Sequence, residues 1–81
     1  MEIKERRGKP FMITEVGYGT RHATVTVRNV AYDKGGNMFF AGPEATETGG
    51  YKYVHQFDPE KAKQLAFENA ADKLLSMTAP E

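Results

Sequence analysis

The sequence predicts an α+β fold: an antiparallel sheet of three or four strands with one C-terminal helix packed on one face. Two observations support this prediction. Residues 58–77 open with Asp58 and Pro59 and then run to Met77 without a glycine or another proline, as a single capped helix does. The preceding residues are rich in Thr, Val, Tyr, Phe and Gly, which is typical of short strands joined by tight turns. With 81 residues, the chain is expected to form one domain, 1–81.

The predicted helix, residues 58–77, has a clear start and one apolar face. Asp58 suits the N-cap position, where its side chain accepts hydrogen bonds from first-turn amides, and Pro59 suits the first helical position. At about 100° per residue, one set of side chains is expected to face the sheet. These residues are Ala62, Ala66, Phe67, Ala70, Leu74 and Met77. Leu65 and Leu75 fall outside that face.

Four segments are predicted as strands: residues 11–16, 23–32, 38–41 and 51–57. The second alternates apolar and polar residues up to Arg28, and the apolar positions then become Val30 and Tyr32. Either a β-bulge near Asn29 or simple exposure of Tyr32 would explain this slip. Residues 33–37, Asp-Lys-Gly-Gly-Asn, are a strong hairpin signal.

Two segments are expected to lie outside the sheet. Residues 1–9 are polar and basic, so they are interpreted as a basic arm or a short helix. Residues 42–50 contain Gly, Pro, Thr and Glu with no large apolar side chain to anchor them. They are therefore expected to form a mobile loop.

The residues with reactive side chains give no catalytic or metal-binding pattern. The chain has no cysteine, its two histidines, His22 and His55, are far apart, and its one serine, Ser76, lies in the helix tail. Gly17-x-Gly19 lacks the third glycine and the helix of a dinucleotide-binding loop. We therefore expect a protein that is not an enzyme and has no metal or cofactor. Without a leader or membrane span, it is also expected to be cytoplasmic.

Charge is balanced over the whole chain but divided between its halves. Residues 1–34 carry seven Lys/Arg and four Asp/Glu, and residues 35–81 carry four Lys/Arg and seven Asp/Glu. An ordinary mixed surface explains this division, and so does a bipolar surface that suits a charged protein partner. The domain-wide basic excess that is usual in nucleic-acid-binding modules is absent.

Short motifs near both ends resemble the double-stranded-RNA-binding domain, an α-β-β-β-α module. Lys9-Pro10-Phe11 precedes the first predicted strand as in that family, and Gly19-Thr20-Arg21-His22 resembles its turn. In the family, a histidine after this glycine reaches an RNA minor groove. The alanine spacing of the last helix is also similar: Ala62-Lys63, Ala66-Phe67, Ala70-Ala71 and Leu74.

The resemblance implies binding of duplex RNA, with a first helix fitted into residues 1–8. The contacts would come from Arg21, His22, Lys61 and Lys63, with Arg6, Arg7 and Lys9 as a basic arm. The chain departs from the family where consecutive lysines grip phosphates, because Pro59 and Glu60 occupy those places. Loss of these cations should cost affinity, since phosphate contacts dominate nucleic-acid binding.

The function predicted first is a small non-enzymatic binding protein that contacts a protein partner or its own copy. Small cysteine-free chains without catalytic residues are often accessory or inhibitor proteins, including those of phages and plasmids. Two aromatic-rich strands exceed what one helix can cover, so a homodimer is the simplest way to bury the surplus. The residues expected to bind the partner are Phe39, Phe40, Tyr51, Tyr53, Leu65 and Leu75. RNA or other nucleic-acid binding is the alternative.

Overall fold

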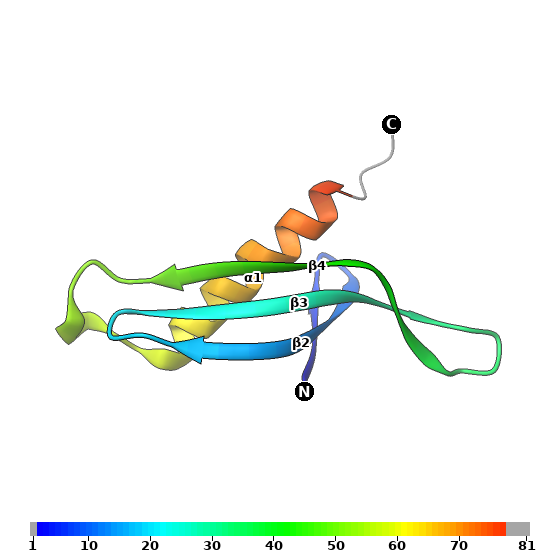
Figure 1. Ribbon diagram of the computed structural model, residues 1–81, viewed down its shortest axis with the longest axis horizontal. Helices are drawn as coiled ribbons and strands as arrows, with labels where there is room; N and C mark the ends of the chain where they lie inside the picture. The colour runs from blue at the N-terminus through cyan, green and yellow to red at the C-terminus, as the bar shows by residue number, and fades with distance from the viewer. Residues whose placement is uncertain (1, 78–81) are drawn as a thin grey trace.

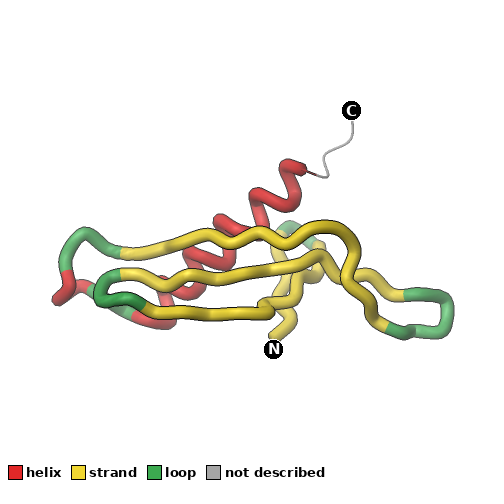
Figure 2. The backbone as a smooth tube through the Cα atoms, in the orientation of Figure 1, coloured by secondary structure: helices red, strands yellow, loops and turns green. Residues whose placement is uncertain are grey.

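The computed structural model describes residues 2–77 and confirms the α+β prediction. Four strands follow one another in one antiparallel sheet of order β1-β2-β3-β4, and one α-helix follows them (Figures 1 and 2). A short 3₁₀ turn, η1, lies between the last strand and the helix. The bounds are β1 Glu2–Arg6, β2 Lys9–Tyr18, β3 His22–Tyr32, β4 Met38–Gly50, η1 Val54–Gln56 and α1 Pro59–Met77.

Helix α1 begins as the sequence indicates. The Asp58 carboxylate accepts hydrogen bonds from the backbone N–H groups of Glu60 at 3.1 Å and Lys61 at 3.3 Å. The buried side chains of α1 are those of Ala62, Ala66, Phe67, Ala70, Ala71 and Leu74. The prediction for Met77 was wrong, because the last turn extends beyond the sheet and leaves this side chain 57% exposed (Figure 1).

The core lies between α1 and one face of the sheet. Phe67 meets Phe11 of β2 edge to face, with ring centroids 6.3 Å apart, and both are fully buried. Gly49 of β4 lets the helix come close, because a Cβ there would stand 2.5 Å from the backbone nitrogen of Ala66. The buried cluster is completed by Ile13, Val25, Val27, Ala45, Ala66, Ala70, Ala71 and Leu74.

The N-terminal segment corrects the expectation of a basic arm or short helix, and equally the first helix that the RNA-binding resemblance implies. Residues 2–6 form β1, which pairs antiparallel with β2 from Glu2↔Ile13 to Arg6↔Lys9. Alternate side chains of β1 reach the helix: Glu2 bonds to Lys63, Lys4 to Gln64 and Arg6 to Asp72. These polar bonds stabilise a strongly charged segment as a strand of the sheet. Met1 lies outside the described residues.

Residues 42–50 also correct an expectation, because they form most of β4 and no mobile loop. From Glu44 to Gly50 they pair with β3, and two pairs of threonine hydroxyls bond across the ladder: Thr26 with Thr46 at 2.7 Å and Thr24 with Thr48 at 3.3 Å. The absence of large apolar residues reflects how close the helix lies at Gly49 and how polar the opposite face is.

The segment 51–57 is wrongly predicted as a strand. The backbone N–H of Tyr51 donates to the Arg21 carbonyl at 2.8 Å, and the chain then turns through η1. The N–H of Phe57 donates to Val54, which closes this turn, and Tyr51 and Phe57 meet edge to face at 6.3 Å. Here the chain has to leave the edge of the sheet and reach the start of α1, so it cannot continue as a strand.

A change of register lies at Asn29, where the slip in alternation predicted a bulge. Pairing moves from Arg28↔Glu44 to Val30↔Phe40, so one residue of β3 faces three residues of β4. The extra residues are on β4, where Gly42 has a φ of 94° and Pro43 cannot donate a ladder hydrogen bond. Tyr32 is also exposed, so both explanations of the slip hold.

Candidate protein-contact surface

Beyond this bulge, β3 and β4 continue together as a two-stranded ribbon that projects past the helix (Figures 1 and 2). We call residues 30–40 the arm. Its pairs are Val30↔Phe40, Ala31↔Phe39 and Tyr32↔Met38. Strand β2 stops pairing with β3 at Asn29, so no strand flanks the arm on either side within the described residues.

The turn at the tip of the arm is built on Asp33. Its carboxylate accepts hydrogen bonds from the backbone N–H groups of Gly35 at 2.9 Å and Asn37 at 2.8 Å, and from the Asn37 side chain at 3.2 Å. These donors hold the pKa of Asp33 below its ordinary value, the Asn37 backbone N–H contributing most. Gly36 supplies the positive φ, 83°, that the turn needs. The turn thus fixes the register of the arm.

The arm exposes four large apolar side chains. Their exposed fractions are 55% for Tyr32, 41% for Met38, 49% for Phe39 and 37% for Phe40. Cross-strand partners share a face, so Phe39 lies with Ala31 on one face and the other three lie on the opposite face. The Arg28 guanidinium stands 4.8 Å from the centre of the Phe40 ring and donates to the Gly42 carbonyl at 2.9 Å. These two contacts hold the base of the arm at the bulge.

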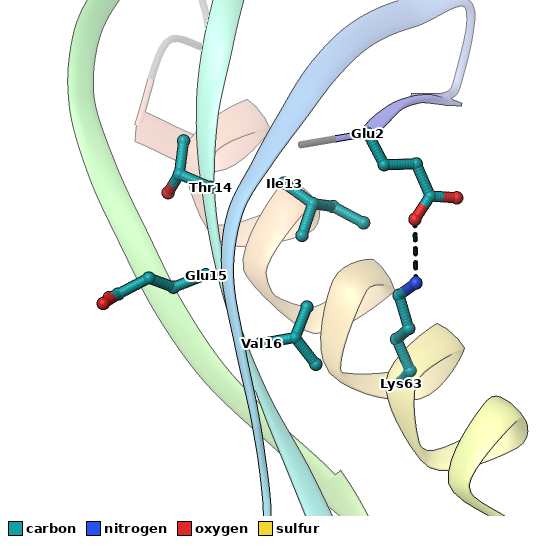
Figure 3. A pocket seen from close by; sticks show the side chains of 6 residues that line it. All are labelled: Glu2, Ile13, Thr14, Glu15, Val16 and Lys63. Carbon is teal, nitrogen blue, oxygen red and sulfur yellow. Dashed lines mark hydrogen bonds and ion pairs between the residues drawn. The ribbon is translucent and has the colours of Figure 1, made fainter.

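A second feature is a notch of about 320 Å³ between β1, β2 and the first half of α1 (Figure 3). Glu2 and Lys63 bond across its mouth at 2.8 Å, which lowers the pKa of Glu2 and raises that of Lys63. Ile13 and Val16 point toward the helix, and Thr14 and Glu15 point to the other side of the sheet (Figure 3). The charges of Glu2 and Lys63 neutralise each other at the mouth of the notch.

A hollow of similar volume, about 320 Å³, lies on the sheet face away from the helix. Thr24, Thr26 and Thr46 line it together with Glu15, Val16 and Gly17. The hydroxyls of Thr26 and Thr46 bond to each other, and that of Thr24 bonds to Thr48. Apart from Glu15, the hollow is lined by residues without charge, and the hydroxyls of its three threonines are already paired.

The six residues expected to bind a partner do not form one surface. Phe39 and Phe40 lie in the arm, whereas Tyr51 and Tyr53 follow the opposite end of β4, where the Tyr53 ring stacks on His55 at 5.6 Å. Leu65 is half-exposed on α1, with its Cβ near Gly49. Leu75 packs against the core.

Sequence reasoning missed Tyr32 and Met38 as parts of this surface. Their signal was present in the slip of alternation at Val30 and Tyr32, next to a strong hairpin turn. When the apolar side chains of a strand change face before the strand reaches its turn, the last part of that strand no longer packs against the helix.

The residues of the nucleic-acid alternative divide into two groups, one where β2 begins and the other toward the end of β2 and the start of α1. Arg6 donates two hydrogen bonds of 3.0 Å to Asp72, which raises the pKa of Arg6 and lowers that of Asp72. Exposed Arg7 stands 4.0 Å from the same carboxylate, and Lys9 pairs with Arg6 in the β1–β2 ladder. The other group is Arg21 and His22 after β2, Lys61 in the first turn of α1, and Lys63, which binds Glu2.

Arg21, His22 and Lys61 are exposed, and the Arg21 guanidinium donates to the Lys52 carbonyl at 3.1 Å. Within residues 2–77 no ion pair involves Arg21, Lys52 or Lys61.

No group of three or more His, Asp or Glu side chains in the described part of the chain is arranged to hold a metal ion. Among the same residues, no helix has the length and the apolar character needed to cross a membrane. Comparison with family models, curated proteins and solved structures finds no match to this chain.

Proposed function

We propose that this is a non-enzymatic binding protein that makes protein–protein contacts through the arm, as an accessory or inhibitor protein of the phage or plasmid type would. The single observation that carries the proposal is the exposure of Tyr32, Met38, Phe39 and Phe40 on one projecting hairpin. Exposed aromatic side chains and methionine are the residues enriched where proteins bind one another.

Within the described residues, the arm has neither a third strand beside it nor a helix over it (Figure 1). An isolated two-stranded hairpin is marginally stable in water, and it gains stability when a third strand or an apolar surface covers it. The helix that covers β3 and β4 elsewhere does not extend over the arm (Figure 1). Strand edges without a neighbour also offer free N–H and C=O groups to another chain. A protein partner can supply both apolar cover and backbone hydrogen bonds.

Site-specific photo-crosslinking tests this proposal. A photoreactive phenylalanine analogue replaces Phe39 in one variant and Tyr53 in a control, because both side chains are 49% exposed but Phe39 lies near the start of β4 and Tyr53 lies beyond its end. We expect crosslinked protein products from position 39 and none from position 53. If position 39 gives no protein product in the producing cells or with the purified chain at high concentration, the arm is not a protein-contact surface.

Nucleic-acid binding is the second candidate, favoured by Arg21, Lys52 and Lys61, none of which has an ion pair with another of residues 2–77. The pairing of Arg6 with Asp72 and of Lys63 with Glu2 counts against it, because those cations are already neutralised. A duplex-RNA titration across salt separates the candidates. Binding would weaken with salt, with a log–log slope of about −0.9 per phosphate contact in the B-DNA reference case. Absence of binding at low salt would remove this candidate.

A further inference from the structure

We infer that the arm binds the arm of a second copy of this chain, through antiparallel contact of the two β4 edges about a two-fold axis at Phe39. The inference rests on the proposed function, since it takes the arm as a protein-contact surface, and it names the partner and the register. Four properties of the arm bear on it: its open edge, the self-complementarity of that edge, the charges at its two ends, and the apolar area that it exposes.

Neither edge of the arm has a neighbouring strand, and the more accessible of the two is that of β4. In the sheet order β1-β2-β3-β4, β4 is the last strand, whereas the edge of β3 faces the side where β2 begins. Further along β4 the edge is interrupted, first by Gly42 and Pro43 in the bulge and then at Thr48, whose carbonyl accepts a hydrogen bond of 3.2 Å from the Asn69 side chain. Residues 38–40 are thus the stretch of this edge that a second strand can reach.

This stretch is complementary to itself. When two copies of a segment pair antiparallel about a two-fold axis, the central residue faces its own copy and its neighbours face each other. With Phe39 at the centre, Phe39 faces Phe39 of the second copy, and Met38 faces Phe40. Residues 38–42 contain no charged side chain, so pairing brings no like charges together.

Charges of opposite sign lie at the two ends of the arm. Lys34 lies in the turn at its tip, and Glu44 lies in β4 next to the bulge at its base. Both are exposed, and neither belongs to an ion pair within residues 2–77. The hairpin tip of each copy would lie toward the bulge of the other, where the long Lys34 side chain can meet Glu44. Complementary charges of this kind favour the antiparallel approach of the two arms.

The apolar area that the arm exposes limits the strength of the contact. An aromatic side chain buries about 150–250 Å², and those of Tyr32, Phe39 and Phe40 are 37–55% exposed. Together with Met38, the arm offers roughly 300–400 Å² of apolar surface per copy on this scale. Two copies fall short of the roughly 1,200 Å² at which specific stable complexes begin. The dimer is therefore weak and reversible, and its population depends on concentration.

Phe39 gives an unusually direct test, because a residue on a two-fold axis meets itself. Three samples are followed by sedimentation velocity from about 1 µM to about 1 mM, the range in which a weak dimer forms: the unaltered chain, Phe39→Lys and Phe39→Glu. We expect concentration-dependent dimers from the first and at least about tenfold weaker association from each variant, since like charges then face each other. An equimolar mixture of the two variants should form dimers again. Tyr53→Lys and Tyr53→Glu are the matched controls and should associate as the unaltered chain does.

Each other outcome overturns the inference. A strict monomer at every concentration excludes the self-partner, and crosslinks from position 39 to a different protein would then preserve the proposed function. Dimers that persist in both Phe39 variants place the interface elsewhere. If both variants lose the dimer and their mixture does not restore it, Phe39 does not lie on the two-fold axis. Circular dichroism of each variant confirms that the exposed substitution has not unfolded the chain.

Discussion

The two halves of the β3–β4 hairpin share the same ladder and differ in what covers them. In the half near His22 and Gly50, Ala23, Val25 and Val27 are fully buried under α1. In the arm, the side chains of Tyr32, Met38 and Phe39 are 41–55% exposed, although they are larger. Burial in this protein is thus decided by the reach of one helix and the bulge at Asn29, and not by how apolar each segment is.

The largest expected effect compares the same substitution in the two regions. Phe67 fills the covered core against Phe11, so Phe67→Ala should cost about 3–5 kcal/mol of the free energy of unfolding. Phe39→Ala, in the arm, should stay within about 0.5 kcal/mol when measured on dilute protein, because it removes an exposed side chain. Urea denaturation followed by circular dichroism gives both values. Equal losses would mean that the arm is packed as tightly as the core.

The second prediction concerns the close contact between the helix and the covered half. Gly49→Ala places a Cβ 2.5 Å from the Ala66 nitrogen and 2.9 Å from the Ala62 carbonyl oxygen, so α1 has to move. We expect a loss of about 1–3 kcal/mol, the usual cost of overpacking.

Gly17→Ala is the matched control for this change. Gly17 lies in β2 with no atom within 4 Å of its added Cβ. Alanine there should be neutral or slightly stabilising, because it restricts the unfolded chain. If Gly49→Ala proved equally harmless in thermal unfolding, the helix would not lie against β4 as described.

A smaller effect concerns the β1 side of the covered region. Arg6 lowers the pKa of Asp72 by hydrogen bonding, so the stabilisation from this pair is present above the ordinary value of 3.8. It is lost as the pH falls through the lowered pKa. Arg6→Gln should therefore reduce stability at neutral pH and flatten its decline in acid, by less than Gly49→Ala because the pair is partly exposed.

Denaturant midpoints measured between neutral pH and acid test this prediction. Arg7→Gln is the control, since Arg7 is 70% exposed and its Nε lies 4.0 Å from Asp72. Identical pH profiles for Arg6→Gln and the unaltered chain would show that the Arg6–Asp72 pair adds no stability.

The smallest effect on global stability is expected in the arm. Asp33→Asn replaces one of two acceptor oxygens with a donor NH₂ group, so the three hydrogen bonds at the tip cannot all form. We expect amide signals of residues 33–40 to shift and exchange faster, while the unfolding midpoint hardly moves. The unaltered arm should lose the same order as the pH falls below 3.8, because the pKa of Asp33 is lowered. Lys34→Gln, next in the turn, should leave these signals in place.

Local signals in the sequence predicted the helix and the hairpin well. Asp58 and Pro59 fix the start of α1, and the Asp33–Asn37 turn is specified by its own side chains. The segments that failed depend on partners distant in the chain. Residues 42–50 look like a loop until β3 pairs with them and α1 covers Gly49, and residues 2–6 look like a charged arm until the helix supplies their counter-charges.

The candidate site was only half predicted for the same reason. Phe39 and Phe40 were identified by their aromatic character, but Tyr32 and Met38 join them because of a register change between two strands. Tyr51 was grouped with them for its aromatic character and Leu75 for its place off the apolar face of the helix, although one packs edge to face on Phe57 and the other packs against the core. Whether exposed residues lie on one surface depends on how the strands pair in three dimensions. The composition of the chain does not contain that information.

The polar bonds between β1 and α1 also bear on the order in which the chain folds as it is synthesised. Glu2 and Lys63 are 61 positions apart, and Arg6 and Asp72 are 66 positions apart. Contacts over such separations close large loops and form late, whereas the β3–β4 hairpin is local. Strand β1 therefore leaves the ribosome well before the helix that bonds to its side chains, so the body of this fold is completed from its middle outward.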